Sequence, residues 1–228
     1  MKTKSLFKNL FTGAAVLAVS VFISSCSKND VDDSGTASIK VVNASPTSTP
    51  QGFYLANKTI VQSGLAFGNE KDYVITNSGN NLELQFRNDG SATAYATGTF
   101  NVDRGKTYTV FLAGDGQSAR VKLYEDDLTA PASGQAKVRF VHLSDAAPAS
   151  IDIRNAGGTN IVANLGRDNA SSFVAMAPGI LSLQVYGAGQ TTNLGNFDIT
   201  TLAAGKIYTV YVAGSTAGNI SVQKITHN

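Results

Sequence analysis

From residue 37 onward, apolar and polar side chains alternate along short runs of the chain. Leu82, Leu84 and Phe86 are separated by polar residues. Because a period of two sends successive side chains to opposite faces of a β-strand, each run predicts a strand with one face in a core and the other in water. The same alternation recurs at Leu181, Leu183 and Val185, at Tyr108, Val110 and Leu112, and at Tyr208, Val210 and Val212. After residue 26, we find no helical period with capping residues.

Residues that favour turns separate these runs. They stand at 77–80, 88–90, 114–116, 155–158 and 187–189. Seven or so short strands in about 90 residues, with turn signals every 8–12 residues or so, predict an antiparallel β-sandwich of immunoglobulin-like type. A small Greek-key barrel is the alternative. The chain has one Cys and no Trp, so the disulfide and core Trp of antibody domains are absent and only the architecture is predicted.

The chain is self-similar at a spacing near 100 residues. Residues 105–114 match 205–214 at a shift of 100, whereas 39–45 match 138–144 and 82–86 match 181–185 at a shift of 99. This period is too long for a solenoid unit, so we expect two tandem, self-sufficient β-sandwich domains. The expected organisation is a cleaved lipoprotein signal peptide (1–25), a lipidated cysteine with a flexible tether (26–36), repeat 1 (37–127), a linker (128–135) and repeat 2 (136–228).

The N-terminus reads as a secretory signal, because lysines at positions 2, 4 and 8 precede an uncharged apolar stretch at 10–23. Fourteen residues span about 21 Å as a helix, which is short of the roughly 30 Å of a bilayer core. The stretch ends in Ile23-Ser24-Ser25-Cys26, which resembles the lipobox of bacterial lipoproteins. The resemblance implies a lipid on Cys26 and membrane attachment through it.

The charge balance changes once the signal is removed. The full chain of 228 residues carries +2, and loss of the three signal lysines leaves −1, so net charge gives no support to a nucleic-acid partner. Asp30, Asp32 and Asp33 follow the cysteine closely. They resemble the export signal of lipoproteins of the Bacteroidetes type, which would place the protein on the outer membrane, exposed at the cell surface. A solvated linker without address value is the alternative.

Two segments carry a family resemblance. Residues 138–148 open with Val-Arg-Phe-Val-His-Leu-Ser, and residues 204–210 read Ala-Gly-Lys-Ile-Tyr-Thr-Val. They resemble a bacterial family of secreted and lipid-anchored domains catalogued as domain of unknown function 4397, often found in tandem, and the resemblance extends over about 37–226. It implies an extracytoplasmic β-sandwich and no particular activity or cofactor.

His142 with Ser144 and Asp145 is the best catalytic candidate. A triad needs a serine hydroxyl on one imidazole nitrogen and a carboxylate on the other, which three near-consecutive residues do not readily provide. The first repeat also has Asn43 where the second has His142. We therefore expect His142 to hydrogen-bond the turn that follows its strand, and we expect the penultimate His227 to lie in a frayed end.

Metal-binding patterns are weak. The acids at 125–127 and at 30, 32 and 33 lack the spacing of a calcium loop. The chain also lacks a set of His and Cys residues that could bind zinc. We expect ordinary solvated charge and no cofactor, with a calcium site that bridges the domains through 125–127 as the alternative.

Exposed tyrosines favour a binding role, since they stack on sugars or anchor protein partners. The ligand-facing candidates are Tyr54, Tyr124, Tyr186, Tyr211 and His142, with Tyr95 on the same kind of polar face. We expect a non-catalytic surface module for adhesion or for assembly with an envelope protein or glycan. The alternative is an extracytoplasmic hydrolase or glycan-active enzyme with a site at the domain interface.

Overall fold

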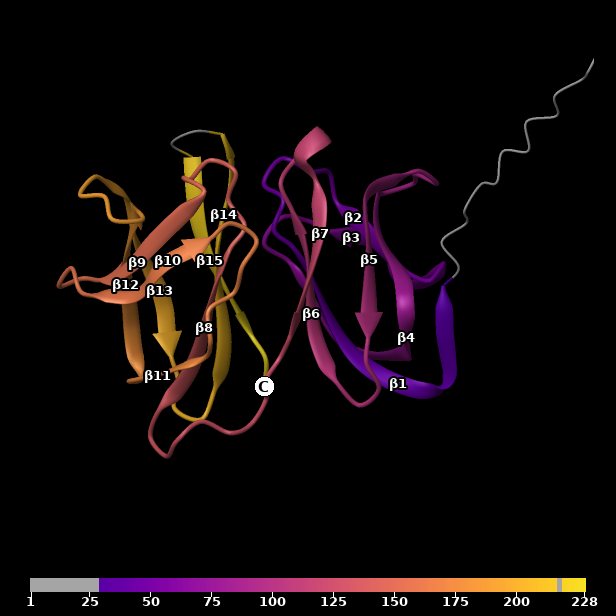
Figure 1. The fold of residues 1–228 in the computed structure, drawn as a ribbon, viewed down its shortest axis with the longest axis horizontal. Helices are drawn as coiled ribbons and strands as arrows, with labels where there is room; N and C mark the ends of the chain where they lie inside the picture. The colour runs from indigo at the N-terminus through magenta and orange to yellow at the C-terminus, as the bar shows by residue number, and fades with distance from the viewer. Residues whose placement is uncertain (1–28, 217–218) are drawn as a thin grey trace, which may run out of the picture.

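The computed structural model describes residues 29–216 and 219–228, and within them regular structure is almost entirely β-strand (Figure 1). The signal peptide and Cys26 lie outside the described residues. The strands are β1 (Asp30–Asn43), β2 (Gln51–Leu55), β3 (Lys58–Leu65), β4 (Glu70–Asn88), β5 (Ala94–Val102), β6 (Thr107–Ala113), β7 (Arg120–Glu125), β8 (Ala136–His142), β9 (Ser150–Asn155), β10 (Asn160–Gly166), β11 (Val174–Met176), β12 (Gly179–Gly187), β13 (Asn193–Leu202), β14 (Ile207–Thr216) and β15 (Asn219–Thr226), with a 3-10 turn at Gly116–Ser118.

Strand pairing falls into an N-terminal half (30–125) and a C-terminal half (136–226). The N-terminal half forms one sheet in the order β3-β2-β4-β1-β6-β7, with β5 paired to β4. The C-terminal half forms two sheets, β10-β9-β12-β13 and β11-β8-β14-β15. The predicted all-β sandwich fold is confirmed, while its immunoglobulin-like topology stays a prediction. Within the described ranges, no helix has the length and apolar content needed to cross a membrane.

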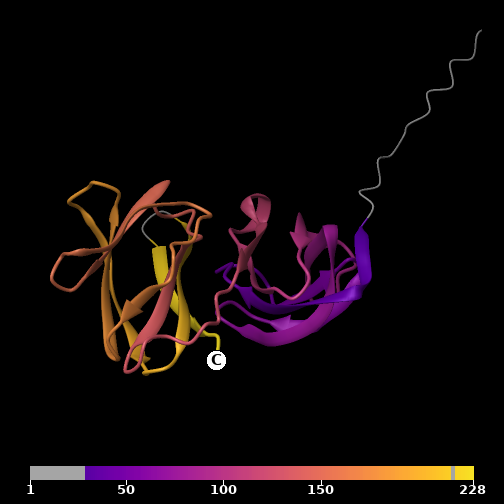
Figure 2. The ribbon, with the colours of Figure 1, turned by 60° about the horizontal axis from the view of Figure 1, so that its bottom comes forward.

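The long strand β4 explains why the N-terminal half has a single sheet. Its first part pairs with β1, and its second part bends away to pair with β2 and β5 (Figure 2). In the C-terminal half the corresponding path is divided into β11 and β12, and Pro178 lies between them. Because proline has no N–H to give to a strand ladder, it interrupts the sheet at this point.

Each half contains one parallel strand pair, which differs from the predicted wholly antiparallel sandwich. In β1 and β6, Val41 pairs with Val110, and in β8 and β14, Phe140 pairs with Val210. The second register thus repeats the first with shifts of 99 and 100 residues. A parallel pair needs a long crossover, and in both halves the intervening strands supply it.

The predicted alternation correctly identifies the two cores. Leu82, Leu84 and Phe86 are fully buried in the N-terminal core, and Leu183 and Val185 are buried in the C-terminal core. The prediction fails on the parallel pairs, where both faces of the strands are covered. Tyr211, predicted to face a ligand, is fully buried, and so is Phe111, which the alternation of Tyr108, Val110 and Leu112 would place on the polar face.

The predicted flexible tether is wrong from residue 30 onward. Asp30, Val31 and Asp32 belong to β1 and pair with the segment 78–80, which was predicted to be part of a turn and instead continues β4. The register shifts between Asp32 and Thr36, where Asp32 Oδ1 accepts hydrogen bonds from the Ser34 amide and hydroxyl at 3.0 and 2.8 Å. The backbone pairing with β4 therefore orders this polar segment.

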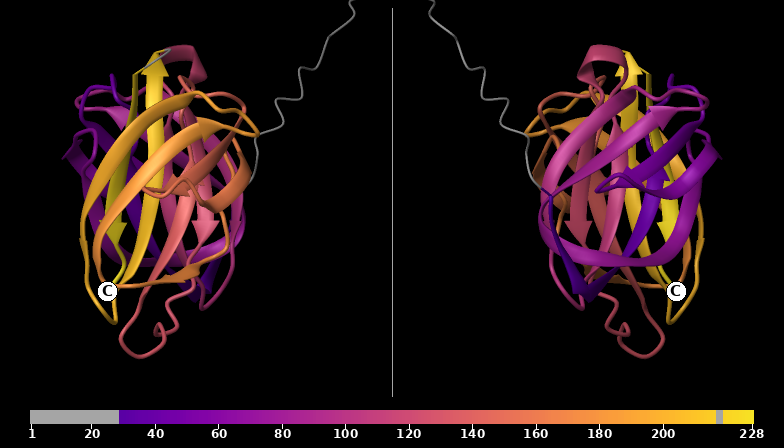
Figure 3. Two further views of the ribbon diagram at one scale, coloured as in Figure 1. Left: turned by 90° about the vertical axis from the view of Figure 1, so that its left-hand side faces the viewer. Right: turned by 90° about the vertical axis from the view of Figure 1, so that its right-hand side faces the viewer.

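The halves pack side by side, so the molecule is a stack of sheet layers (Figure 1). Strands β6 and β7 of one half lie next to β8, β14 and β15 of the other, and a third buried cluster joins them. The layers formed by β9, β10, β12 and β13 and by β2, β3, β5 and the second part of β4 face opposite ends of the molecule (Figure 3). These outer faces are the surfaces that the mutual contact leaves open.

Candidate functional site

The two halves meet through equivalent faces. Val42 and Phe111 on one side contact Val141 and Tyr211 on the other, and all four are fully buried. The rings of Phe111 and Tyr211 meet edge to face with centroids 5.3 Å apart. Each side chain has its counterpart 99 or 100 residues away. The contact therefore resembles that of a two-fold symmetric dimer built within one chain.

A closed ring of hydrogen bonds lies at one end of this contact. Arg139 Nη2 donates to Asp126 Oδ1 at 2.6 Å and to Thr209 Oγ1 at 3.1 Å. Thr209 Oγ1 lies 2.8 Å from His227 Nε2. The Tyr73 hydroxyl lies 2.6 Å from His227 Nδ1 and donates to Asp126 Oδ2 at 2.8 Å. Because Tyr73 has a single proton to give, His227 is protonated on Nδ1 and accepts from Thr209 at Nε2.

Burial sets the charge states in this ring. It lowers the pKa of His227 to about 3, with Arg139 as the next contribution, so the imidazole is neutral. Burial also raises the pKa of the Asp126 carboxyl, and the charge of Arg139 opposes that rise. The expectations of a solvated Asp126 and a frayed His227 are both wrong, since the two residues are 7% and 6% exposed.

An ionic network holds the other end of the contact. Arg120 Nε lies 2.8 Å from both carboxylate oxygens of Asp168, and its Nη1 donates to Asp145 Oδ2 at 2.9 Å. Arg120 belongs to β7, whereas both acids belong to the C-terminal half. Tyr124 adds a bond from its hydroxyl to the Asp168 carbonyl at 2.9 Å. Together with the apolar cluster, these contacts fix how the halves sit on each other.

His142 takes the structural role that its strand-end position predicts. It is fully buried, its Nε2 lies 2.9 Å from the Pro148 carbonyl, and its Nδ1 accepts from the Ser144 amide at 3.3 Å. Burial lowers the pKa of this imidazole. Asn43 performs the same task in the N-terminal half, where its Oδ1 accepts from the Ser45 amide at 2.9 Å.

The structure does not assemble the considered triad. The Ser144 hydroxyl accepts from the amides of Ala146 and Ala147 at 3.2 Å, and Asp145 pairs with Arg120. Neither group lies on an imidazole nitrogen of His142, whose ring is enclosed. His142 is therefore not ligand-facing.

The acids at 125–127 diverge. Glu125 pairs with Lys106 at 2.7 Å and Asp127 with Lys137 at 2.8 Å, while Asp126 is held by Arg139. In the part of the chain that the structure describes, no three His, Cys, Asp or Glu side chains converge as a metal site would require. The considered calcium bridge between the halves therefore has no ligand set here.

The alternative function, a hydrolase or glycan-active enzyme, would have its site in the groove between the halves. It measures about 390 Å³ and is lined by Tyr124, Arg139 and Phe173 among others. The guanidinium of Arg139 lies 4.9 Å from the Phe173 ring centre. Since Arg139 and Tyr124 are already bonded within the contact between the halves, this groove is formed by structural groups.

The tyrosine candidates separate into three situations. Tyr211 is fully buried between the halves, and Tyr124 is half-buried with its hydroxyl bonded to the chain. Tyr95 is also half-buried, and its hydroxyl accepts from the Gly116 amide. Tyr54 and Tyr186 alone among the candidates lie on the outer faces, and each is stacked under an arginine.

The outer face of the N-terminal half holds the Tyr54 stack. Arg87 of β4 lies over the ring of Tyr54 of β2, 4.1 Å from its centre. Nε and Nη2 of Arg87 donate to Gln85 Oε1 at 3.0 and 2.5 Å. Tyr54 and Arg87 line a hollow of about 480 Å³ whose remaining wall includes Gln62, Ser63, Asn88 and Ser91. Hydroxyl and amide groups around a cation and an aromatic ring suit a polar ligand.

The C-terminal half has the same stack with its partners exchanged. Arg154 occupies the position equivalent to Tyr54, and Tyr186 the position equivalent to Arg87, with the guanidinium 4.0 Å from the ring centre. Here the cation is engaged, because Arg154 donates to Asp152 at 3.2 Å, to Asn160 at 2.9 Å and to the Gln190 carbonyl at 3.0 Å. This stack therefore serves the structure of its own half.

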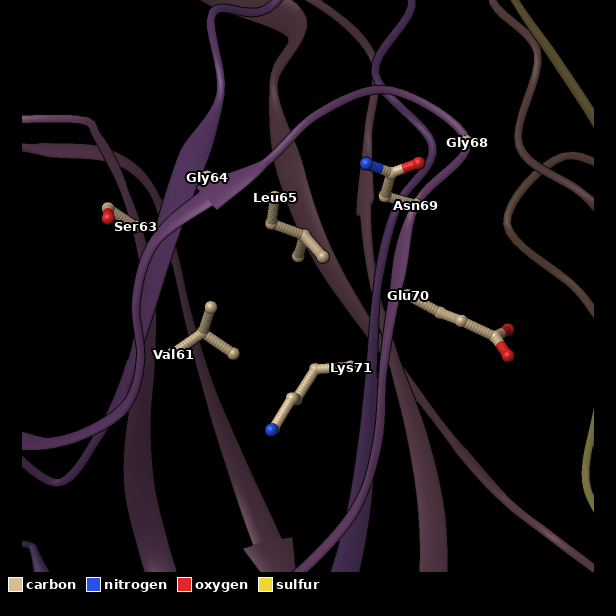
Figure 4. A pocket seen from close by; sticks show the side chains of 8 residues that line it. All are labelled: Val61, Ser63, Gly64, Leu65, Gly68, Asn69, Glu70 and Lys71. Atoms are coloured by element: carbon tan, nitrogen blue, oxygen red, sulfur yellow. The ribbon is translucent and has the colours of Figure 1, made fainter.

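A second hollow of about 480 Å³ adjoins the first at Ser63, which lines both. It lies between β3 and the start of β4, with Val61 and Leu65 directed into it (Figure 4). The Lys71 amine also points into this hollow, whereas Glu70 points away from it (Figure 4). Glu70 accepts from the buried Lys40 at 3.3 Å.

Sequence reasoning selected Tyr54 but missed Arg87, Gln85 and Lys71. One signal was available in the repeats. When 54 is compared with 154 and 87 with 186, a tyrosine and an arginine exchange places. An exchange of two residue types between two equivalent positions indicates a contact, since the pair is kept while each member changes.

The comparisons with known proteins give a family and distant structural likenesses. No curated protein matches the chain. The C-terminal domain of AlgF from P. aeruginosa is 22% identical, with 41% of this chain and 98% of that chain covered at a TM-score of 0.33. A family CBM26 domain from Eubacterium rectale Amy13K, solved with maltoheptaose, is 14% identical, with 82% and 95% covered at a TM-score of 0.26. The model of the family described as domain of unknown function (DUF4397) matches residues 37–154, and the chain belongs to that family.

Proposed function

We propose that the protein is a non-catalytic binding module of the cell envelope whose ligand contacts the outer face of the N-terminal half. The observation that carries this proposal is the open Arg87–Tyr54 stack in its polar hollow. The inner faces of both halves are covered by each other, so the outer faces are what the molecule offers to a partner.

The non-catalytic role is supported by how the reactive groups are engaged. Both nitrogens of His142 are hydrogen-bonded within its own turn, and His227 and Asp126 belong to the ring between the halves. His142, His227 and Asp126 are therefore not placed to exchange a proton with a substrate. A hydrolytic activity that His142→Ala removes without loss of folding would contradict the proposal.

We further propose that the halves are two tandem copies of the family domain. The repeated strand registers and the exchanged Arg–Tyr stack support this reading. The contact between the halves then orients the two copies as one unit, which presents the binding face in a fixed direction.

The location in the envelope is proposed from the sequence. The lipobox-like Ile23-Ser24-Ser25-Cys26 supports a lipid anchor, and the acids that follow support the outer membrane and its outer surface. In cell fractionation, Cys26→Ala is expected to release the protein from the membrane fraction. Retention of that variant in the membrane would overturn the lipid anchor.

The binding role is tested on intact cells. The mature protein is added with a crosslinker and recovered together with any envelope protein or glycan, alongside a Tyr54→Ala variant. A Tyr186→Ala variant is the matched control, because Tyr186 lies under an arginine that is already paired. We expect recovery to fall with Tyr54→Ala only, and equal recovery by all three proteins would place the ligand elsewhere.

A further inference from the structure

We propose that the hollow around Arg87 binds a carboxylate of an acidic sugar chain. This inference rests on the proposed binding function and assigns its ligand class. Arg87 is the starting point, because among the described residues no ion pair is formed with its guanidinium, whereas Arg154 at the equivalent stack is paired with Asp152. The N-terminal stack thus presents a cation that lacks the carboxylate its counterpart has.

The guanidinium is held ready for such a partner. The ring of Tyr54 supports its plane, and Gln85 Oε1 accepts from the Nε and Nη2 side. The amide of Gln85 is itself oriented by a bond to Glu83. The end-on edge, formed by Nη1 and the second proton of Nη2, has no hydrogen-bond partner among the described residues, and Arg87 lines the hollow. A carboxylate can accept two parallel bonds from that edge, which is the strongest geometry for this pair.

The remaining wall suits sugar hydroxyls. Gln62 and Ser63 are exposed, and Asn88 is half-buried with its Oδ1 already accepting from Gln51 Nε2 at 2.6 Å. Its amide N–H groups therefore remain as donors. A wall of amides and hydroxyls around one cation matches a ligand rich in hydroxyls with one acid on each unit.

The nearby acids do not occupy the site. Asp89, next to the hollow in sequence, accepts from the Gly64 amide at 3.0 and 3.1 Å. Glu70 beside the second hollow is bonded to Lys40. Glu83, on the same face, is bonded to Gln85. These carboxylates are therefore engaged elsewhere, and none of them forms an ion pair with Arg87 among the described residues.

The second hollow extends the site around β3. Ser63 lines both hollows, and the Lys71 amine points into the second one (Figure 4). Among the described residues Lys71 has no ion pair. A chain of several acidic sugars can place one carboxylate at Arg87 and another at Lys71, so affinity should rise with chain length.

The test uses calorimetric titration of the protein with Cys26→Ala, which prevents lipidation, and without the signal peptide at 1–25. The probes are hexagalacturonate, its fully methyl-esterified neutral form, and hexaglutamate, which has comparable carboxylates on a peptide. We expect hexagalacturonate to bind at least about tenfold more tightly than the other two, with an affinity that weakens as salt increases.

Two matched variants assign the binding to the site. Arg87→Gln should weaken hexagalacturonate binding by about ten- to a hundredfold, the size expected for hydrogen bonds between charged groups. Arg154→Gln removes the equivalent arginine and should change affinity less than about twofold, and circular dichroism verifies that both variants fold. Lys71→Gln should weaken hexagalacturonate but leave digalacturonate unchanged.

Several outcomes overturn the inference. They are equal binding of the methyl ester, tighter binding of hexaglutamate, equal effects of Arg87→Gln and Arg154→Gln, or no binding of hexagalacturonate at all. The crosslinking experiment on cells separates these from a failure of the binding function. If Tyr54-dependent recovery of a partner persists there, the module still binds and only its assignment to acidic sugars falls.

Discussion

Tyr211 and Phe111 occupy equivalent positions in the two halves and pack edge to face on each other, yet only Tyr211 carries a hydroxyl. That hydroxyl is buried and finds no hydrogen-bond partner among the described residues. An unsatisfied buried hydroxyl costs about 1–3 kcal/mol. We therefore expect Tyr211→Phe to raise the free energy of unfolding by about 1 kcal/mol, measured by urea denaturation.

A second tyrosine provides the control for this prediction. The hydroxyl of Tyr208 accepts from the Ala203 amide at 3.0 Å, so Tyr208→Phe removes a made bond and is expected to lower the unfolding free energy. If both substitutions destabilise the protein by the same amount, the hydroxyl of Tyr211 has a partner after all.

Because Arg139 pairs with Asp126, we expect replacing one of them to lower the free energy of unfolding more than replacing both. Asp126→Leu leaves the guanidinium of Arg139 buried without its carboxylate and should cost about 3–5 kcal/mol of unfolding free energy. Replacing both, as Asp126→Leu with Arg139→Met, should recover most of that loss. Chemical denaturation of the four proteins gives the coupling energy, and additive effects would contradict it.

The neutral His227 predicts loss of stability in acid. Its folded pKa of about 3 lies below the ordinary value near 6.5, so the unfolded chain binds more protons between these two values. Stability due to this residue is complete above about pH 6.5 and declines as the pH falls through that window. Buried His142, whose pKa is also lowered, acts in the same direction.

The contribution of His227 is isolated by difference. Urea denaturation at pH 7.5 and 5.5 is compared for the native protein and for His227→Gln, in which Asp126, Arg139 and the other facing charges are kept. The native protein should lose more stability over this interval than the variant. Equal losses would show that His227 is not the group that titrates.

Gly114 predicts a steric effect close to the ionic network. Its φ is +67°, and a Cβ there would lie 2.3 Å from the Ser118 carbonyl and 2.6 Å from Arg120 Nη1. Gly105 has a φ of +75° with nothing within 4 Å, so it tests backbone strain alone. We expect Gly105→Ala to lower the free energy of unfolding by about 1 kcal/mol and Gly114→Ala to lower it clearly more. The thermal midpoints of the two variants should fall in the same order.

The fold could be predicted because the relevant signals are local. Alternation at 82–86 and 181–185 identifies core faces, and the position of His142 at a strand end predicts its role in the turn. The continuous apolar run 110–113 also carried a signal, since strands buried on both faces lose alternation. The alternation of Tyr108, Val110 and Leu112 places Phe111 on the polar face instead, whereas Phe111 is fully buried.

The site and the contact between the halves could not be predicted in the same way. Asp126 and Arg139 are 13 residues apart, on either side of the linker, and His227 lies far from both in sequence. Each reads as an ordinary polar residue in its own neighbourhood. Their burial depends on how two preformed surfaces fit together. Likewise Arg87 becomes distinctive only when the paired state of Arg154 is seen beside it.

The two halves pack through equivalent faces within one chain. Their association therefore does not depend on protein concentration, whereas two separate subunits would first have to meet in solution. The connection through residues 126–135 keeps the two surfaces at a high effective concentration. Cutting the chain there would convert an intramolecular contact into a bimolecular one, and the thermal midpoint would then depend on how much protein is present. Released halves would expose the aromatic surface around Phe111 and Tyr211, through which two identical halves could pair.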